Sequence, residues 1–115
     1  MSLFTNLLSR ARQAPPAFPG AGVYHYLREG PSGKVRVHLR LEEDGRGLLL
    51  VNAARVYHLN PSSACMAYLN LEGHADDAAA RAVGRRFRVS RAEALRDYRE
   101  FAARLALMVS PEEHC

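Results

Sequence analysis

The chain has 115 residues, a length that fits one domain, because domains usually have about 100–200 residues. Hydrophobic residues make up 48% of it and charged residues 24%, a composition that excludes wholesale disorder. No apolar run approaches the ~20 residues that cross a bilayer, and residues 1–19 lack the pattern of a secretory signal, so we expect no membrane partner. Two cysteines, Cys65 and Cys115, form no disulfide framework, which favours a cytoplasmic setting.

The net charge of +4 is concentrated in the first half of the chain. Residues 1–59 carry eight basic and four acidic side chains, whereas residues 60–115 carry eight of each. An excess of this size does not by itself indicate binding to nucleic acid.

Residues 1–20 are predicted to form an N-terminal arm and a linker. Leu3, Leu7 and Leu8 recur at helical spacing, which indicates a short amphipathic helix that would need a surface to pack on. A proline-rich stretch then predicts an extended linker. The domain itself is therefore expected over residues 21–110.

Apolar and polar residues alternate along the first part of this domain. The clearest alternation predicts a strand over residues 34–41 with one buried face and one wet face. Further strand candidates, separated by turn sequences, cover residues 24–28, 48–51 and 55–59. Together they predict an antiparallel meander of three to four strands.

Three helices are predicted after the strands. Asn60 is a good N-cap for the first helix, and Gly73 is placed to end it. The second helix opens at Asp76, and Ser90 caps a third, longest helix that runs to about Met108. Strands followed by helices predict an α+β fold.

Four segments between residues 48 and 73 occur in a recognisable order: Leu48-Leu49-Leu50-Val51, Val56-Tyr57-His58-Leu59-Asn60, Ser62-Ser63-Ala64, and Gly73. In this order, and with two more helices behind them, the stretch from Leu48 to Met108 resembles the PqqD family. Members are small winged-helix-like proteins that present precursor peptides to modifying enzymes, often radical SAM enzymes. This chain departs from the family pattern in having Glu72 before Gly73, and Asp76 where a threonine cap is usual.

The resemblance implies that the leader segment of a precursor peptide adds as an extra strand between the last strand and the third helix. On this sequence, the implied strand edge is Arg55, Val56, Tyr57, His58 and Leu59, and the implied opposite wall is Arg91, Leu95 and Tyr98. The two arginines would suit an acidic leader. The implied partners are a precursor peptide and a modifying enzyme of the radical SAM type, either separate or fused in a longer chain.

These positions also fit structural roles. Leu95 and Tyr98 lie at helical spacing with other apolar residues, which is equally typical of a core. Val56 and Leu59 could face the interior, and Arg55 could be an ordinary charge on an edge strand that discourages aggregation.

Neither catalysis nor a cofactor is expected. No nucleophile is paired with a base in a known motif, and no glycine-rich phosphate loop is present. His25, His38 and His58 could approach one another in the sheet, but no cysteine or carboxylate stands at metal-ligand spacing, so no metal site is expected.

Two other function classes stay open. A winged-helix nucleic-acid-binding protein is suggested by an arginine cluster at residues 81–91, but acids interleave with the arginines of the third helix, so we expect no nucleic-acid partner. A structural docking or dimerisation domain is the other class, because an unpaired last strand can pair with its own copy in a homodimer.

Overall fold

A computed structural model describes residues 18–30 and 33–110 of the chain. The elements are, in order, β1 (Gly22–Gly30), β2 (Gly33–Leu41), β3 (Gly47–Val51), β4 (Arg55–Leu59), α2 (Pro61–Leu71), α3 (Asp76–Phe87) and α4 (Arg91–Met108). The strands form one antiparallel sheet in the order β1-β2-β3-β4. The predicted α+β fold, a meander followed by three helices, is thereby confirmed. The predicted helix of the arm lies outside the described residues.

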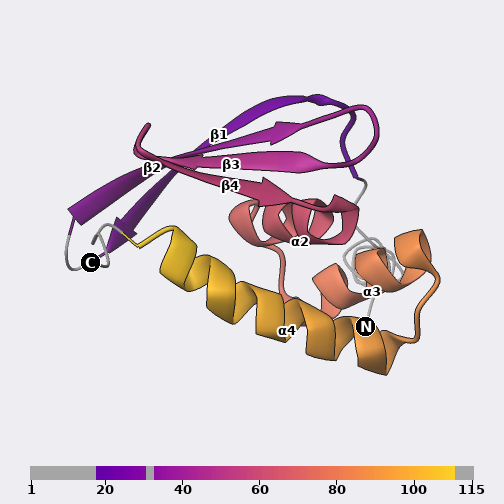
Figure 1. The fold of residues 1–115 in the computed structure, drawn as a ribbon. Helices are drawn as coiled ribbons and strands as arrows, with labels where there is room; N and C mark the ends of the chain where they lie inside the picture. The colour runs from indigo at the N-terminus through magenta and orange to yellow at the C-terminus, as the bar shows by residue number, and fades with distance from the viewer. Residues whose placement is uncertain (1–17, 31–32, 111–115) are drawn as a thin grey trace, which may run out of the picture.

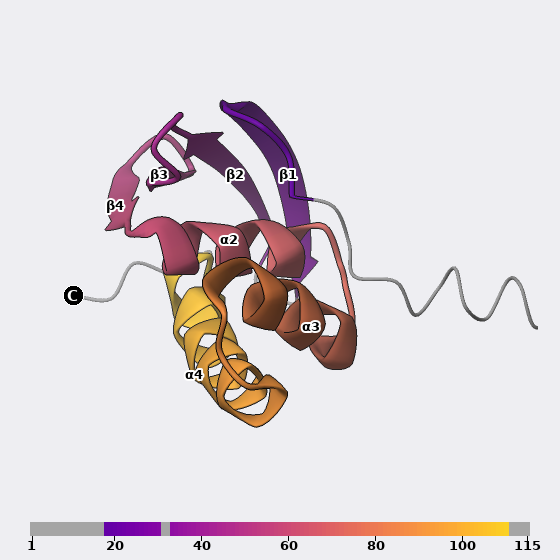
Figure 2. The ribbon, with the colours of Figure 1, turned by 90° about the vertical axis from the view of Figure 1, so that its right-hand side faces the viewer.

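All three helices lie on one side of the sheet (Figures 1 and 2). Helix α2 packs directly on β2, β3 and β4, whereas α3 packs mainly on α4. The sheet therefore has one covered face and one face that no described helix covers. We call the latter the open face.

The alternation in β2 produces the covered face. Its side chains at Val35, Val37, Leu39 and Leu41 are all buried, as the sequence predicts. Residues of β3 directly opposite them are buried as well, since Leu49 pairs with Leu39 across the strands. Burial of aliphatic side chains of this size contributes about 1.5–3 kcal/mol each, so this layer contributes substantially to the stability of the fold.

Two predicted helix caps are confirmed. The side-chain oxygen of Asn60 accepts a hydrogen bond of 2.8 Å from a backbone N–H of α2, and the Ser90 hydroxyl accepts one of 3.1 Å from the Glu93 N–H in α4. Helix α3 differs, because its N-cap is Ala75, which makes no side-chain cap. Asp76 is instead the first helical residue, where its negative charge favours the positive end of the helix dipole.

A close approach of β3 to α2 sets the distance between the sheet and the helices. A Cβ atom added at Gly47 would lie 2.9 Å from the Cβ of Ala64, which is shorter than a normal contact between carbon atoms. Glycine at this position therefore lets α2 lie against the strand.

The substitution Gly47→Ala is expected to lower the free energy of unfolding by about 1–3 kcal/mol, because the helix must move away from the sheet. Urea denaturation measures this change. A matched control is Gly20→Ala, since an added Cβ there meets nothing within 4 Å. Introducing Ala64→Gly into the Gly47→Ala variant should restore part of the loss. Equal destabilisation by the two glycine substitutions would contradict the close-packing explanation.

Candidate functional site

The last strand, β4, lies at an edge of the sheet. In the described part of the chain it pairs with β3 alone, from Arg55 opposite Val51 to Leu59 opposite Gly47. In an antiparallel strand, alternate residues direct their N–H and C=O groups away from the neighbouring strand. The outer side of β4, here called the β4 edge, is therefore a template on which another strand can pair.

Side chains of β4 alternate between the two faces of the sheet. Arg55, Tyr57 and Leu59 point to the covered face, and Leu59 is buried there. Val56 and His58 point to the open face, and both are exposed. A strand that paired with β4 would therefore lie beside both apolar and polar side chains of β4 on each face of the sheet.

The C-terminal end of α4 lies next to the start of β4. The Arg55 guanidinium donates a hydrogen bond to the backbone carbonyl of Ser110, just beyond this helix. In Figure 2, α4 lies on the side of the molecule where β4 is, and α3 lies toward the side of β1. The part of α4 nearest the β4 edge is thus its second half.

The structure places Arg91 and Leu95 in the seam between α3 and α4, rather than in a wall opposite β4. Arg91 begins this helix of 18 residues, roughly 27 Å from its other end at 1.5 Å per residue. It pairs with Asp77 of α3 at 3.6 Å, and Arg99 pairs with Asp76 at 3.4 Å. Leu95 lies between these arginines on the same helical stripe and therefore faces α3.

Tyr98 belongs to the core. Its side chain is 1% exposed, and its hydroxyl accepts a hydrogen bond of 3.3 Å from the side-chain nitrogen of Asn70 in α2. The Asn70 side-chain oxygen in turn accepts a bond of 2.6 Å from Arg28 in β1. Burial raises the pKa of the Tyr98 hydroxyl. Tyr98 is thus linked through Asn70 to α2 and to β1, and it is not available to a peptide.

A different stripe of α4 faces away from α3. It contains Arg104, whose guanidinium carbon lies 5.9 Å from the centre of the Phe101 ring, and Met108, which is partly buried against the core. The sequence pattern did not single out these residues, because helical periodicity shows which side chains point inward but not which neighbour they meet.

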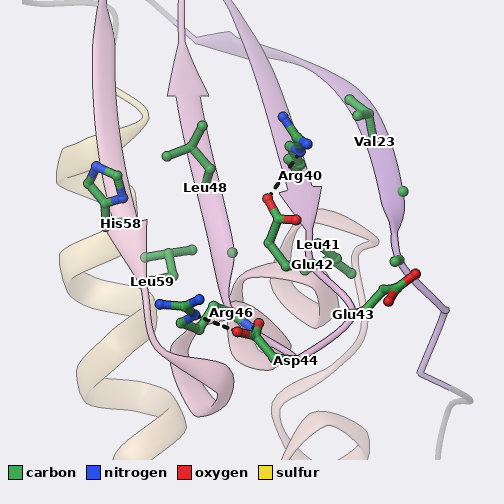
Figure 3. Close-up of a pocket in the computed structure, with 13 residues that line it drawn as sticks. Val23, Arg40, Leu41, Glu42, Glu43, Asp44, Arg46, Leu48, His58 and Leu59 are labelled. Atoms are coloured by element: carbon green, nitrogen blue, oxygen red, sulfur yellow. Dashed lines mark hydrogen bonds and ion pairs between the residues drawn. The ribbon is translucent and has the colours of Figure 1, made fainter.

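A shallow hollow opens on the open face at one end of the sheet. It has a volume of about 920 Å³, and its lining extends from Val23 in β1 across Leu48 in β3 to His58 in β4 (Figure 3). The end of the hollow at His58 borders the β4 edge and could receive side chains of a strand bound there, whereas the end at Val23 lies at the opposite edge of the sheet.

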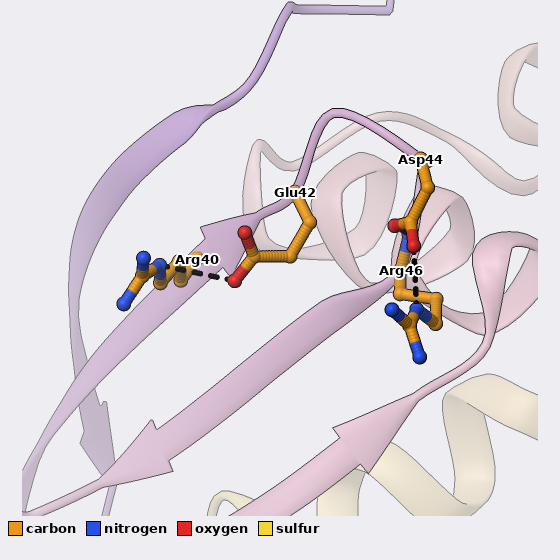
Figure 4. Close-up of polar contacts among 4 residues, drawn as sticks. All are labelled: Arg40, Glu42, Asp44 and Arg46. Carbon is orange, nitrogen blue, oxygen red and sulfur yellow. Dashed lines mark hydrogen bonds and ion pairs between the residues drawn. The ribbon is translucent and has the colours of Figure 1, made fainter.

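Both arginines of this hollow are already paired with carboxylates. Arg40 lies 3.1 Å from Glu42, and Arg46 lies 2.7 Å from Asp44 (Figure 4). The backbone N–H of Arg46, together with its guanidinium, lowers the pKa of the Asp44 carboxyl. Exposed pairs of this kind contribute only about 0–1 kcal/mol, so a charged ligand can exchange with either partner.

The one cysteine in the described residues is a buried thiol of the core. Cys65 is buried in α2 and forms no disulfide. Burial raises the pKa of its thiol to about 11, despite the opposing effect of the Arg86 charge. At neutral pH the group is a protonated thiol and a poor nucleophile.

The structure brings two of the three strand histidines together. The rings of His25 and His38 lie edge to face with centroids 4.4 Å apart, whereas His58 is on the far strand of the sheet. Within residues 18–30 and 33–110, no three His, Cys, Asp or Glu side chains are grouped to hold a metal ion. In the same part of the chain, no helix is both long enough and apolar enough to span a membrane.

Comparison of the chain with protein-family models, with curated proteins and with solved structures found no match. The resemblance to the PqqD family therefore stays a prediction, and the geometry of the β4 edge is the main structural indication of function.

The raised pKa of Cys65 leads to a chemical prediction. In a Cys115→Ser variant, the rate of alkylation of the folded protein by iodoacetamide should keep rising with pH beyond about pH 9, because the thiolate increases up to the pKa of about 11. Mass spectrometry measures the rate, and the urea-unfolded protein is the control. A rate that levels off near pH 9 in the folded protein, as for an exposed thiol, would contradict this assignment.

Proposed function

We propose that this domain binds an extended peptide as a fifth strand on the β4 edge and presents it to a modifying enzyme, of the radical SAM type that the PqqD resemblance implies. The observation that carries the proposal is an edge strand, Arg55–Leu59, with the C-terminal half of α4 beside its first residue. Main-chain pairing would give affinity, and the side chains on either face of β4 would give sequence preference.

The available interactions are sufficient for measurable affinity. Pairing along five residues would form about four to six hydrogen bonds, each with a net contribution of about 0.5–1.5 kcal/mol. Apolar peptide side chains against Val56 and Tyr57 would add about 1.5–3 kcal/mol each. After the cost of ordering a flexible peptide, a binding free energy of about −8 kcal/mol, or a micromolar Kd, is expected.

The charges beside the β4 edge favour an acidic peptide. Arg55 and Arg104 both lie toward the C-terminal end of α4, and arginine forms strong charge-assisted bonds with carboxylates. Arg91 does not add to this preference, because it pairs with Asp77 at the opposite end of the helix.

Nucleic-acid binding through α4 has less support. Arg96 of this helix lies 3.9 Å from Glu93 and 3.6 Å from Asp97, and Arg99 pairs with Asp76. These carboxylates oppose contact with phosphates, so α4 does not present a continuous basic surface.

Strand addition can be tested through the peptide backbone. The candidate ligands are the short peptides encoded beside this chain, titrated into the full chain by calorimetry. Two versions of the tightest binder then carry N-methyl groups on alternate residues, one set in each version. One version should lose binding by about tenfold or more, whereas the other should bind nearly as the parent does, because only alternate N–H groups face β4. Equal loss in both versions would indicate a helical or irregular bound form and exclude strand addition.

A matched pair of variants tests which edge is used. Val56 and Val23 are 51% and 52% exposed on the open face, one on each edge strand. Val56→Asp should weaken binding of the peptide by about tenfold, since a charge replaces an apolar contact and repels an acidic ligand. Val23→Asp should leave the Kd unchanged. The reverse result would move the site to β1, and tight, salt-sensitive binding to duplex DNA instead of peptide would favour the winged-helix alternative.

A further inference from the structure

The open face of the sheet carries apolar side chains that no described helix covers. The exposed large hydrophobic residues of the described chain include Val23, Leu27 and Val56, at 52%, 55% and 51%, all on this face. Leu48 and Leu50 of β3 lie between them and are half-buried. Aliphatic side chains thus lie on β1, β3 and β4 of the open face. A sheet face exposed to solvent is usually polar.

The same face is basic. Its cations on β2 are Lys34, Arg36 and Arg40. Lys34 is paired with Glu29 at 3.4 Å, and Arg40 with Glu42 at 3.1 Å. Arg36 is exposed and has no carboxylate partner among residues 18–30 and 33–110. The centre of the face therefore has an unbalanced positive charge.

Two adjoining hollows border Arg36 and His38. The larger, of about 610 Å³, is also lined by Leu27, and the smaller, of about 240 Å³, by Leu50. Each hollow thus combines the same cation with an aliphatic side chain. This arrangement suits a ligand that offers a carboxylate next to apolar groups.

The backbone under these hollows is firmly held. The side-chain oxygen of Asn52 accepts a 2.9 Å hydrogen bond from the Arg36 N–H, and the Asn52 N–H donates a 2.8 Å bond to the Arg36 carbonyl. Asn52 has a φ of +54°, in the left-handed region that asparagine tolerates better than most residues. The turn between β3 and β4 is thereby fixed to β2, and the base of the Arg36 side chain is fixed with it.

We infer that the open face is a second binding site, separate from the β4 edge, and that it binds an acidic segment of a partner protein. A glutamate or aspartate of that segment pairs with Arg36, and aliphatic neighbours pack on Leu27 and Leu50. This inference does not depend on the proposed function, because it uses the face of the sheet and not its edge.

Charge and side-chain chemistry favour this occupant over others. A second copy of the chain would bring one Arg36-centred basic face against another. The chain's own residues 1–17 contain two arginines and no carboxylate, so they are not complementary either. Single-stranded nucleic acid binds sheet faces by stacking on aromatic rings, but Tyr24, Tyr26 and Tyr57 all point to the covered face. The aromatic rings of the open face are those of histidines, and two of them, His25 and His38, already lie edge to face against each other.

The test is an NMR titration of the ¹⁵N-labelled full chain with a synthetic peptide of Glu-Leu-Glu repeats. Amide shifts are expected at Arg36, His38 and Asn52. The Arg36→Glu variant should bind about tenfold more weakly or worse, because a charge-assisted pair is replaced by repulsion. Arg85→Glu is the matched control, since Arg85 is an exposed arginine of α3 and the substitution changes the net charge equally. A Gln-Leu-Gln peptide should not bind.

Three outcomes would overturn the inference. Equal weakening by Arg36→Glu and Arg85→Glu would show attraction by net charge alone. Shifts confined to β4 would assign the peptide to the strand edge, where the alternately N-methylated peptides test the proposed function independently. Tighter binding of single-stranded RNA than of the acidic peptide, with shifts on the same face at the same ionic strength, would identify a nucleic-acid surface.

Discussion

The packing of one sheet face on α2 is the contact on which the rest of the structure depends. Val37, Leu39 and Leu49 are completely buried there, and Gly47 lets the helix come close enough to exclude water from them. Because α3 and α4 stack behind α2 on the same side, they add nothing to the other face (Figure 2). A sheet covered on one side keeps two unpaired edges and one bare face in the described chain.

Both candidate binding surfaces follow from this one-sided arrangement. The β4 edge offers main-chain groups, since β4 comes last in the meander and no described strand follows it. The open face offers side chains, since every second residue of each strand must point away from the core. Val56 belongs to both surfaces, whereas Tyr57 supports the edge from the covered side. Exposed apolar groups grouped on one face are typical of interaction surfaces, which agrees with the two proposed sites.

The fold could be predicted from the sequence because its signals are local. Strict alternation in β2 and the caps at Asn60 and Ser90 depend only on residues a few positions apart, and all three are confirmed.

The site could be predicted only in part. The edge strand β4 could be predicted because it comes last in the meander. The neighbours of the inward side chains of α4 could not, because such side chains can contact either a strand or another helix. Leu95 lies on the stripe of α4 that carries the ion pairs to α3, and Tyr98 is buried in the core, where it accepts a hydrogen bond from α2. Contacts between residues that are far apart in the sequence leave no periodic pattern in that sequence.

The two proposed surfaces meet at right angles, which has a consequence for specificity. A peptide paired with β4 would lie in the plane of the sheet and would extend the open face by one strand. Half of its side chains would then stand beside Val56 and His58 on that face, within reach of the large hollow that His58 borders. A partner docked around Arg36 would thus contact both the domain and the peptide. A modifying enzyme that docked there could distinguish the loaded domain from the empty one without touching the paired backbone, because only the loaded domain presents the additional row of side chains.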